Sequence, residues 1–137
     1  MRIELTGTPD FKFKAKSGNG YSFDIGASKS IGGDESGFRP MELVLAGVAS
    51  CAGIDIVNIL KKSRVEFTGM DIEVNGERKD ATPAPFTHIE VVYKIHGPGI
   101  DRAKAERAVS LALEKYCSVS ASLDQNIRVV AKTVLDG

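Results

Sequence analysis

One long apolar run constrains the fold of this chain more than any other feature. From Pro40 to Leu60 nearly every residue is apolar or small. A helix on the surface of a protein shows a polar face along its length, and this run shows none, so we expect a helix that is buried on every side. Pro40 suits the first turn, where a missing N–H loses no hydrogen bond. Lys61 and Lys62 suit the negative end of the helix dipole. The run therefore predicts a buried helix from Pro40 to about Lys62.

The same run is long enough to raise the question of a membrane span. Glu42, Asp55 and Asn58 interrupt it, and charged groups inside a span are costly. The first residues of the chain lack the apolar core of a signal peptide. Eighteen basic residues balance 18 acidic ones, and no basic patch points to nucleic acid. We expect a cytoplasmic protein that binds neither membranes nor nucleic acid.

The pattern of the remaining chain predicts an α+β fold in a single domain covering residues 1–137. Alternating apolar residues on both sides of Asn19-Gly20 predict a β-hairpin, and a long loop rich in glycine follows over residues 26–39. Asp101 is a plausible N-cap for a second helix. Further strands are expected over residues 70–75 and 87–95 and from residue 127 onward. We expect antiparallel pairing with the helices on the sheet. Because one sheet face cannot bury the apolar helix on all sides, we expect an interlocked homodimer.

Cys51 and Cys117 are the residues with the clearest chemical potential. Cys51 lies inside the apolar run, where a cysteine commonly serves as a small core residue. A functional role would require the thiolate, which is the nucleophilic form. Cys117 lies where the second helical pattern ends. If that helix continues to it, the helix dipole raises its pKa; if Ser118 caps a new short helix, nearby amide donors favour the thiolate. The sequence leaves both alternatives open.

The segments around the two cysteines carry a family resemblance. Arg39-Pro40-Met41-Glu42-Leu43 leading to Ala49-Ser50-Cys51, with Glu114-Lys115-Tyr116-Cys117-Ser118-Val119 downstream, resembles the OsmC/Ohr family of thiol peroxidases. Phe86-Thr87-His88-Ile89 is similar to the YhfA-like branch of that family. The resemblance implies an intertwined homodimer in which antiparallel sheets surround central helices that carry the cysteines. It also implies that Cys51 attacks an organic hydroperoxide and that Cys117 resolves the sulfenic acid to a disulfide, which a dithiol or lipoyl-type reductant reopens.

The chain departs from the family pattern at two places. The family's peroxidases carry a glutamate directly after the proline, where this chain has Met41, and Glu42 comes one residue later, on the other side of the helix from Cys51. They also bring an arginine from the amino-terminal sheet to the thiolate. Lys14, Lys16 or Arg39 could supply that charge here, although a lysine lacks the bidentate fork of arginine.

Other candidate sites have less support. His88 and His96 lie on the polar face of one strand, too far apart to share a metal ion, so no metal site is expected. No cofactor is indicated. The leading hypothesis is a cysteine-based organic hydroperoxide reductase that acts in oxidative-stress defence. The alternative is a non-catalytic dimer of the same fold whose cysteines line a pocket for a small apolar ligand.

Overall fold

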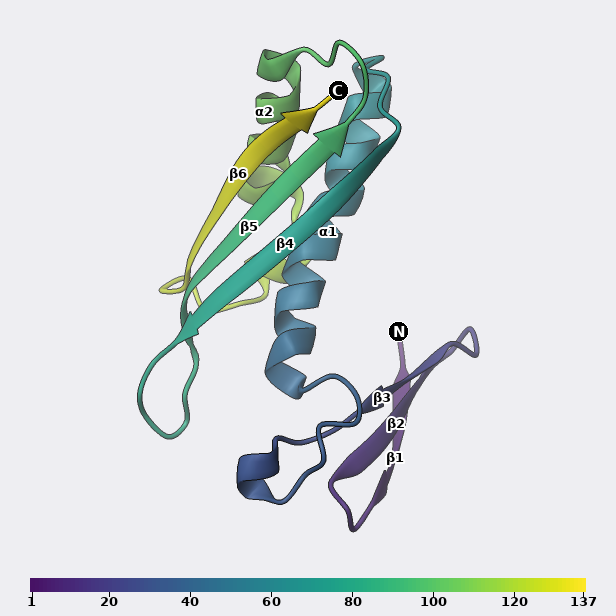
Figure 1. Cartoon of the computed structure of the whole chain (residues 1–137), viewed down its shortest axis with the longest axis vertical. Helices are drawn as coiled ribbons and strands as arrows, with labels where there is room; N and C mark the ends of the chain where they lie inside the picture. The colour runs from purple at the N-terminus through teal and green to yellow at the C-terminus, as the bar shows by residue number, and fades with distance from the viewer. The chain divides into compact units, whose positions relative to one another are not determined.

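The computed structural model describes residues 1–137, which form two compact units, Met1–Val44 and Leu45–Gly137. The first unit holds one three-stranded sheet, and the second holds another three-stranded sheet together with most of the long helix and the helices that follow it. The mixture of sheets and helices confirms the predicted α+β class (Figure 1).

The sheet of the first unit is an antiparallel meander of β1 (Ile3–Thr8), β2 (Lys12–Ser17) and β3 (Ser22–Ile25). The predicted hairpin is β2–β3, whereas β1 was not anticipated. A short 3₁₀ helix, η1 (Lys29–Ile31), interrupts the segment that we expected to be loop throughout. The register places Leu5, Ala15 and Phe23 in one row across the sheet. Because side chains alternate between the faces of a strand, the lysines of β2 lie on the opposite face.

The second unit contains the long predicted helix, α1, whose bounds Pro40–Lys62 agree with the expectation, although its first turn belongs to the first unit. The sheet elements β4 (Gly69–Arg78) and β5 (Phe86–His96) follow it. After them come α2 (Arg102–Leu111), the π-helical turn η2 (Ala112–Tyr116), the short α3 (Ser118–Ala121) and β6 (Arg128–Asp136). In Figure 1, α2 and the cysteine-bearing part of α1 lie on the same face of the sheet β4–β5–β6.

The pairing of the last strand corrects one sequence expectation. β4 and β5 are antiparallel, as predicted, but β6 runs parallel to β5. The chain leaves β5, passes through α2 and α3, and only then enters β6. A connection of this length and helical content is what parallel neighbours require, whereas antiparallel neighbours can be joined by a tight turn.

The core of this unit lies between the sheet and the helices. Ile89, Val91, Tyr93 and Ile95 share the inner face of β5 and are fully buried. On α2 the buried residues are Ala105, Ala108 and Val109, as their helical spacing predicts. The Asp101 side chain caps α2 by accepting a hydrogen bond from the Lys104 backbone N–H at 3.2 Å.

Within one chain, α1 is not buried on every side, which agrees with the expectation that one sheet face cannot bury it alone. Its buried face comprises Val48, Ala49, Ala52, Gly53, Ile56 and Leu60. Ile54, in contrast, is 70% exposed. One sheet and one neighbouring helix cover only part of the circumference of a helix, and this geometry accounts for the difference. By length and hydropathy alone α1 also qualifies as a membrane span, a test that the core helix of a soluble protein passes as well.

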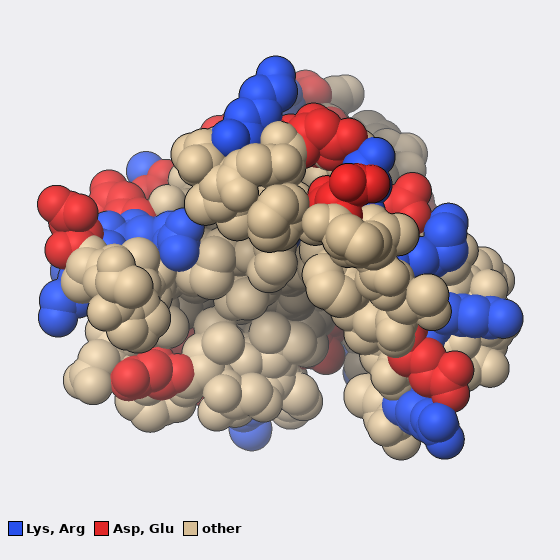
Figure 2. Space-filling model, turned by 90° about the horizontal axis from the view of Figure 1, so that it is seen from below, with Lys and Arg blue, Asp and Glu red and all other residues tan.

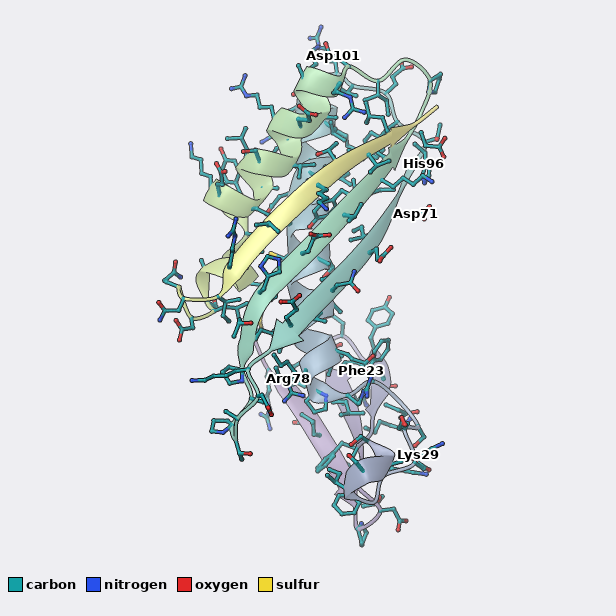
Figure 3. The ribbon with its side chains drawn as sticks, turned by 60° about the vertical axis from the view of Figure 1, so that its left-hand side comes forward. Phe23, Lys29, Asp71, Arg78, His96 and Asp101 are labelled. Carbon is teal, nitrogen blue, oxygen red and sulfur yellow. The ribbon has the colours of Figure 1, made fainter.

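The charged side chains follow no single-sign pattern on the face shown in Figure 2, where Lys and Arg lie among Asp and Glu. One compact cluster joins the three strands of the second sheet at one end. His96 on β5 lies between Asp71 on β4, at 2.7 Å, and Asp136 on β6, at 3.3 Å. Figure 3 shows Asp71 and His96 at this end of the sheet. His88, the other histidine that was considered as a metal ligand, is not part of this cluster.

Candidate functional site

Cys51 lies at the middle of α1, next to the face that packs on the sheet. Small residues around it allow a close approach. A Cβ atom at Gly53 would lie 3.0 Å from Ile72 Cδ1 of β4 and 3.9 Å from the Tyr93 ring of β5. Cys51 itself is only partly buried, whereas Cys117 is buried.

Cys117 is carried to α1 by an irregular end of α2. The chain widens into the π turn η2, where the Cys117 backbone N–H donates to the Ala112 carbonyl at 2.8 Å. Cys117 then takes an extended backbone conformation and ends the turn. Its side chain is turned inward, is 4% exposed, and has its sulfur 4.0 Å from the Val48 carbonyl oxygen of α1. π turns inside helices often occur at functional sites, and here the turn delivers the second cysteine to the helix that carries the first.

Neither predicted alternative for Cys117 is met in full. The regular helix ends before it, and Cys117 itself, rather than Ser118, is the N-cap of α3, where its sulfur accepts a hydrogen bond from the Ser120 N–H at 3.3 Å. That donor favours the thiolate. Burial outweighs it and raises the pKa of Cys117, and the hydrogen bond and charge of the Cys51 side chain raise it further. Cys117 therefore stays a protonated thiol at neutral pH.

The same interaction shows that the fold brings Cys51 and Cys117 together. Both cysteines are free, and the two side chains are close enough to interact directly. Both belong to the second unit, Leu45–Gly137. Their proximity therefore depends on how α1, η2 and the sheet β4–β5–β6 are arranged within that unit. One thiol is partly accessible and the other is buried.

Tyr93 is the residue at this site that sequence reasoning missed. It was assigned only to the inner face of its strand, yet its hydroxyl donates a hydrogen bond to the Ala49 carbonyl of α1 at 3.1 Å. Burial raises the pKa of the Tyr93 phenol far above its usual range, and the negative charges of Cys117 and Cys51 raise it further. It is therefore a neutral donor to the backbone of the helix that carries Cys51. Its signal in the sequence was a hydroxyl-bearing ring on a face otherwise made of aliphatic side chains, because a buried tyrosine must find a partner for its O–H.

The charged candidates belong to the first unit, where Arg39 pairs with Glu42 and Lys14 with a neighbouring acid. Arg39 Nε lies 3.1 Å from Glu42 Oε1, and its backbone N–H donates to the same oxygen at 2.9 Å. This arrangement caps the start of α1 and holds the pKa of Glu42 below its usual range. Lys14 pairs with Asp24 at 3.2 Å. Lys16, on the same strand, lies on the surface. These residues and the cysteines belong to different units.

Comparison with known proteins identifies the family to which the chain belongs. The sequence profile described as OsmC-like protein matches residues 32–132. The chain belongs to the OsmC-like family. It is 37% identical over 90 residues to Protein YhfA of Escherichia coli strain K12, a match that covers 66% of this chain and 67% of YhfA. It is 29% identical over 110 residues to the organic hydroperoxide resistance protein OhrB of Bacillus subtilis, covering 78% of this chain and 77% of OhrB.

The fold is shared with solved structures over nearly the whole chain. A hypothetical protein from Aquifex aeolicus superposes with a TM-score of 0.81 at 31% identity, covering 99% of this chain and 97% of that one. A putative osmotic stress induced and detoxification response protein from Psychrobacter arcticus gives a TM-score of 0.83 at 18% identity, covering 98% and 94%. The resemblance predicted from the cysteine segments is thus confirmed at the level of family and fold.

Proposed function

We propose that this OsmC-like protein is a cysteine-based reductase of organic hydroperoxides that protects the cytoplasm against oxidative stress. The observation that carries the proposal is the meeting of Cys51 and Cys117, which are far apart in the sequence, beside one core tyrosine. The likeness to OhrB, a protein named for organic hydroperoxide resistance, supports the same reading.

The difference in burial between the two thiols supports the roles that we assign to them. Cys51 is partly exposed and meets the substrate first, whereas Cys117 is buried and its raised pKa keeps its proton. The Cys51 thiolate attacks the terminal oxygen of the hydroperoxide, the O–O bond breaks, and the alkoxide takes a proton to leave as an alcohol. Cys51 is then a sulfenic acid. Cys117 attacks its sulfur, water leaves, and a disulfide forms. A dithiol or lipoyl-type reductant returns both thiols and is itself oxidised to a disulfide.

The apolar surroundings of Cys51 favour alkyl or lipid hydroperoxides over hydrogen peroxide. Val48 and Ala52, its neighbours on α1, are buried, and neither can hydrogen-bond a small polar oxidant with its side chain.

A homodimer belongs to the proposal because both units leave apolar surface uncovered. Leu5 and Phe23 on one face of the first sheet are 52% and 42% exposed, and Ile54 on α1 is 70% exposed. Monomeric soluble proteins rarely leave contiguous apolar patches of this kind open. A second copy of the chain would cover these surfaces and would complete the burial that the composition of α1 demands.

Thiol titration tests the function. The reduced protein is treated with a slight excess of cumene hydroperoxide and its free thiols are counted. We expect two thiols to be lost per chain, and Cys51→Ser to abolish the loss at Cys117. Unchanged thiols, or equal oxidation of Cys117 in the variant, would remove the enzyme proposal and favour a non-catalytic binding protein.

A further inference from the structure

Strand β6 forms one edge of the second sheet, and this edge is open along its length. β6 is the last strand in the order β4–β5–β6, so every second residue directs its backbone N–H and C=O away from β5. The register with β5 is unbroken from Arg128 to Asp136, so no bulge interrupts the edge, and the strand contains no proline. Such an edge is a template on which another extended segment can pair.

A cavity of about 420 Å³ lies beside this edge, between β6 and the segment formed by α2 and η2. Val129, Ala131 and Thr133 belong to its strand wall. They pair in register with buried residues of β5, yet they are only half-buried themselves. In Figure 1, α2 lies alongside β6. A segment that paired with the β6 edge would therefore direct one row of its side chains toward α2 and η2.

The helical wall of the cavity favours a positively charged occupant. Glu106 on α2 and Glu114 on η2 line it, and no basic side chain does. Both glutamates are exposed, and the contact of Glu106 with Arg102, at 3.2 Å, is a surface ion pair of the kind that contributes little to stability. The wall also includes the apolar Val109 and Leu113. A cation is thus favoured near each glutamate, and an apolar group between them.

The spacing of the two glutamates sets the spacing of the matching side chains. Glu106 and Glu114 are eight residues apart in the chain, which corresponds to about 12 Å along a helix axis. In an extended segment, residues i and i+4 point to the same side and are about 13 Å apart, with residue i+2 between them. Basic residues at i and i+4 can therefore reach both glutamates while an apolar residue at i+2 packs on the wall.

We propose that the groove between α2 and β6 binds an extended basic segment of another protein as an additional strand of the sheet. The segment reads basic–x–apolar–x–basic, where x is any residue. Its backbone pairs with the β6 edge, its basic side chains meet Glu106 and Glu114, and its apolar side chain packs on Leu113. In strand addition, main-chain hydrogen bonds give affinity and alternate side chains give specificity. The cavity includes neither cysteine, so this inference is independent of the proposed function.

A synthetic peptide tests the proposal on the full-length protein. The probe has seven residues and blocked ends, with lysine at positions 2 and 6, valine at position 4 and threonine elsewhere. Calorimetric titration at low salt should show binding, and a peptide with glutamate in place of both lysines should bind at least about tenfold more weakly. Amide NMR signals should shift in β6 and α2 and not in β4.

Methylation of the peptide backbone separates strand pairing from simple attraction of charges. Alternate amides of a strand point toward opposite neighbours, so only one alternate set can bond to β6. One peptide is N-methylated at positions 2, 4 and 6 and another at positions 3 and 5. We expect one of the two peptides to lose binding and the other to keep it. Equal affinities of the two methylated peptides would overturn the strand pairing.

Substitution of the glutamates tests the groove from the side of the protein. Glu106→Gln combined with Glu114→Gln should weaken binding of the lysine peptide about tenfold, because two exposed ion pairs are lost. Glu77→Gln, which removes an exposed carboxylate from β4, should leave the affinity unchanged. Since all three side chains are exposed, the variants should keep their fold, which circular dichroism checks.

Three results would overturn the inference. They are no binding of the lysine peptide, equal binding of the glutamate peptide, and an affinity that the double substitution leaves unchanged. Slow hydrogen exchange of the outward-facing β6 amides in the peptide-free protein would also contradict it, because a second copy of the chain would then already occupy the edge. None of these results changes the expected loss of two thiols to cumene hydroperoxide.

Discussion

At the scale of single residues, the two cysteines differ through their surroundings and not through their chemistry. Cys117 is buried, and its pKa is raised above the usual value of 9.0 although a backbone N–H donates to its sulfur. The free-energy cost of removing a thiolate from water exceeds the stabilisation that one amide hydrogen bond provides. The protein therefore keeps the Cys117 thiol protonated and leaves Cys51 only partly buried.

This difference predicts the order of alkylation. Because the thiolate is the reactive form, iodoacetamide at pH 8 should modify Cys51 about tenfold faster than Cys117 or more. The rate at Cys117 should rise only above pH 9, since its folded pKa lies above that of an ordinary thiol. Timed alkylation followed by peptide mass spectrometry measures both rates. Equal rates at pH 8 would contradict the roles assigned to the two residues.

The raised pKa of Cys117 also fixes the sign of its effect on stability. Below the pKa of the unfolded chain, the Cys117 thiol is protonated in both the folded and the unfolded state. Its burial therefore adds no pH dependence to the free energy of unfolding in that range. Above about pH 9 the unfolded chain loses this proton while the folded one keeps it, and the free energy of unfolding falls until the folded pKa is passed. Cys117→Ser should reduce this alkaline loss in urea titrations at pH 8 and pH 10. An identical decline in both proteins would show that other groups cause it.

At the scale of elements, contact between α1 and the sheet depends on glycine. A Cβ atom at Gly53 would lie 3.0 Å from Ile72 Cδ1, whereas one at Gly47 would lie 3.5 Å from Val119 Cγ1, an ordinary contact. The two glycines therefore allow a tight contact and an ordinary contact to be compared within one helix.

Substitution at these positions should have opposite effects. Gly53→Leu overpacks the helix–sheet contact and should lower the free energy of unfolding by about 1–3 kcal/mol. Gly47→Ala should raise it by up to about 1 kcal/mol, because alanine favours a helix over glycine. Urea denaturation followed by circular dichroism measures both changes. A Gly53→Leu protein of unchanged stability would refute the close packing of α1 on β4.

Elements were predictable where one local pattern determined them. The bounds of α1 follow from Pro40 and the end of the apolar run, and Asp101 marks the start of α2 as its capping bond confirms. The parallel pairing of β6 could not be derived, because it depends on where the crossover through α2 returns the chain. The surroundings of Cys117 depend on a π turn with no sequence signature known to us, and the role of Tyr93 depends on a partner on another element.

At the scale of the whole molecule, the uncovered apolar surfaces predict association. Stable protein interfaces bury roughly 1,200–2,000 Å² in total. A charge at the 70%-exposed Ile54 would be carried into that interface, so Ile54→Glu should convert the dimer to a monomer. Phe23→Glu on the first sheet should have the same effect. Light scattering coupled to gel filtration gives the mass. A monomeric unsubstituted protein would contradict the second-copy explanation of the apolar helix.

The most direct measurement of the central claim is to locate the disulfide that one equivalent of cumene hydroperoxide produces. The oxidised protein is digested without reduction, and the linked peptides are identified by mass spectrometry. The account predicts a bond between Cys51 and Cys117 of the same chain, formed in a single turnover and reopened by a dithiol. Oxidation that left Cys117 free, or that joined cysteines of different chains, would contradict it.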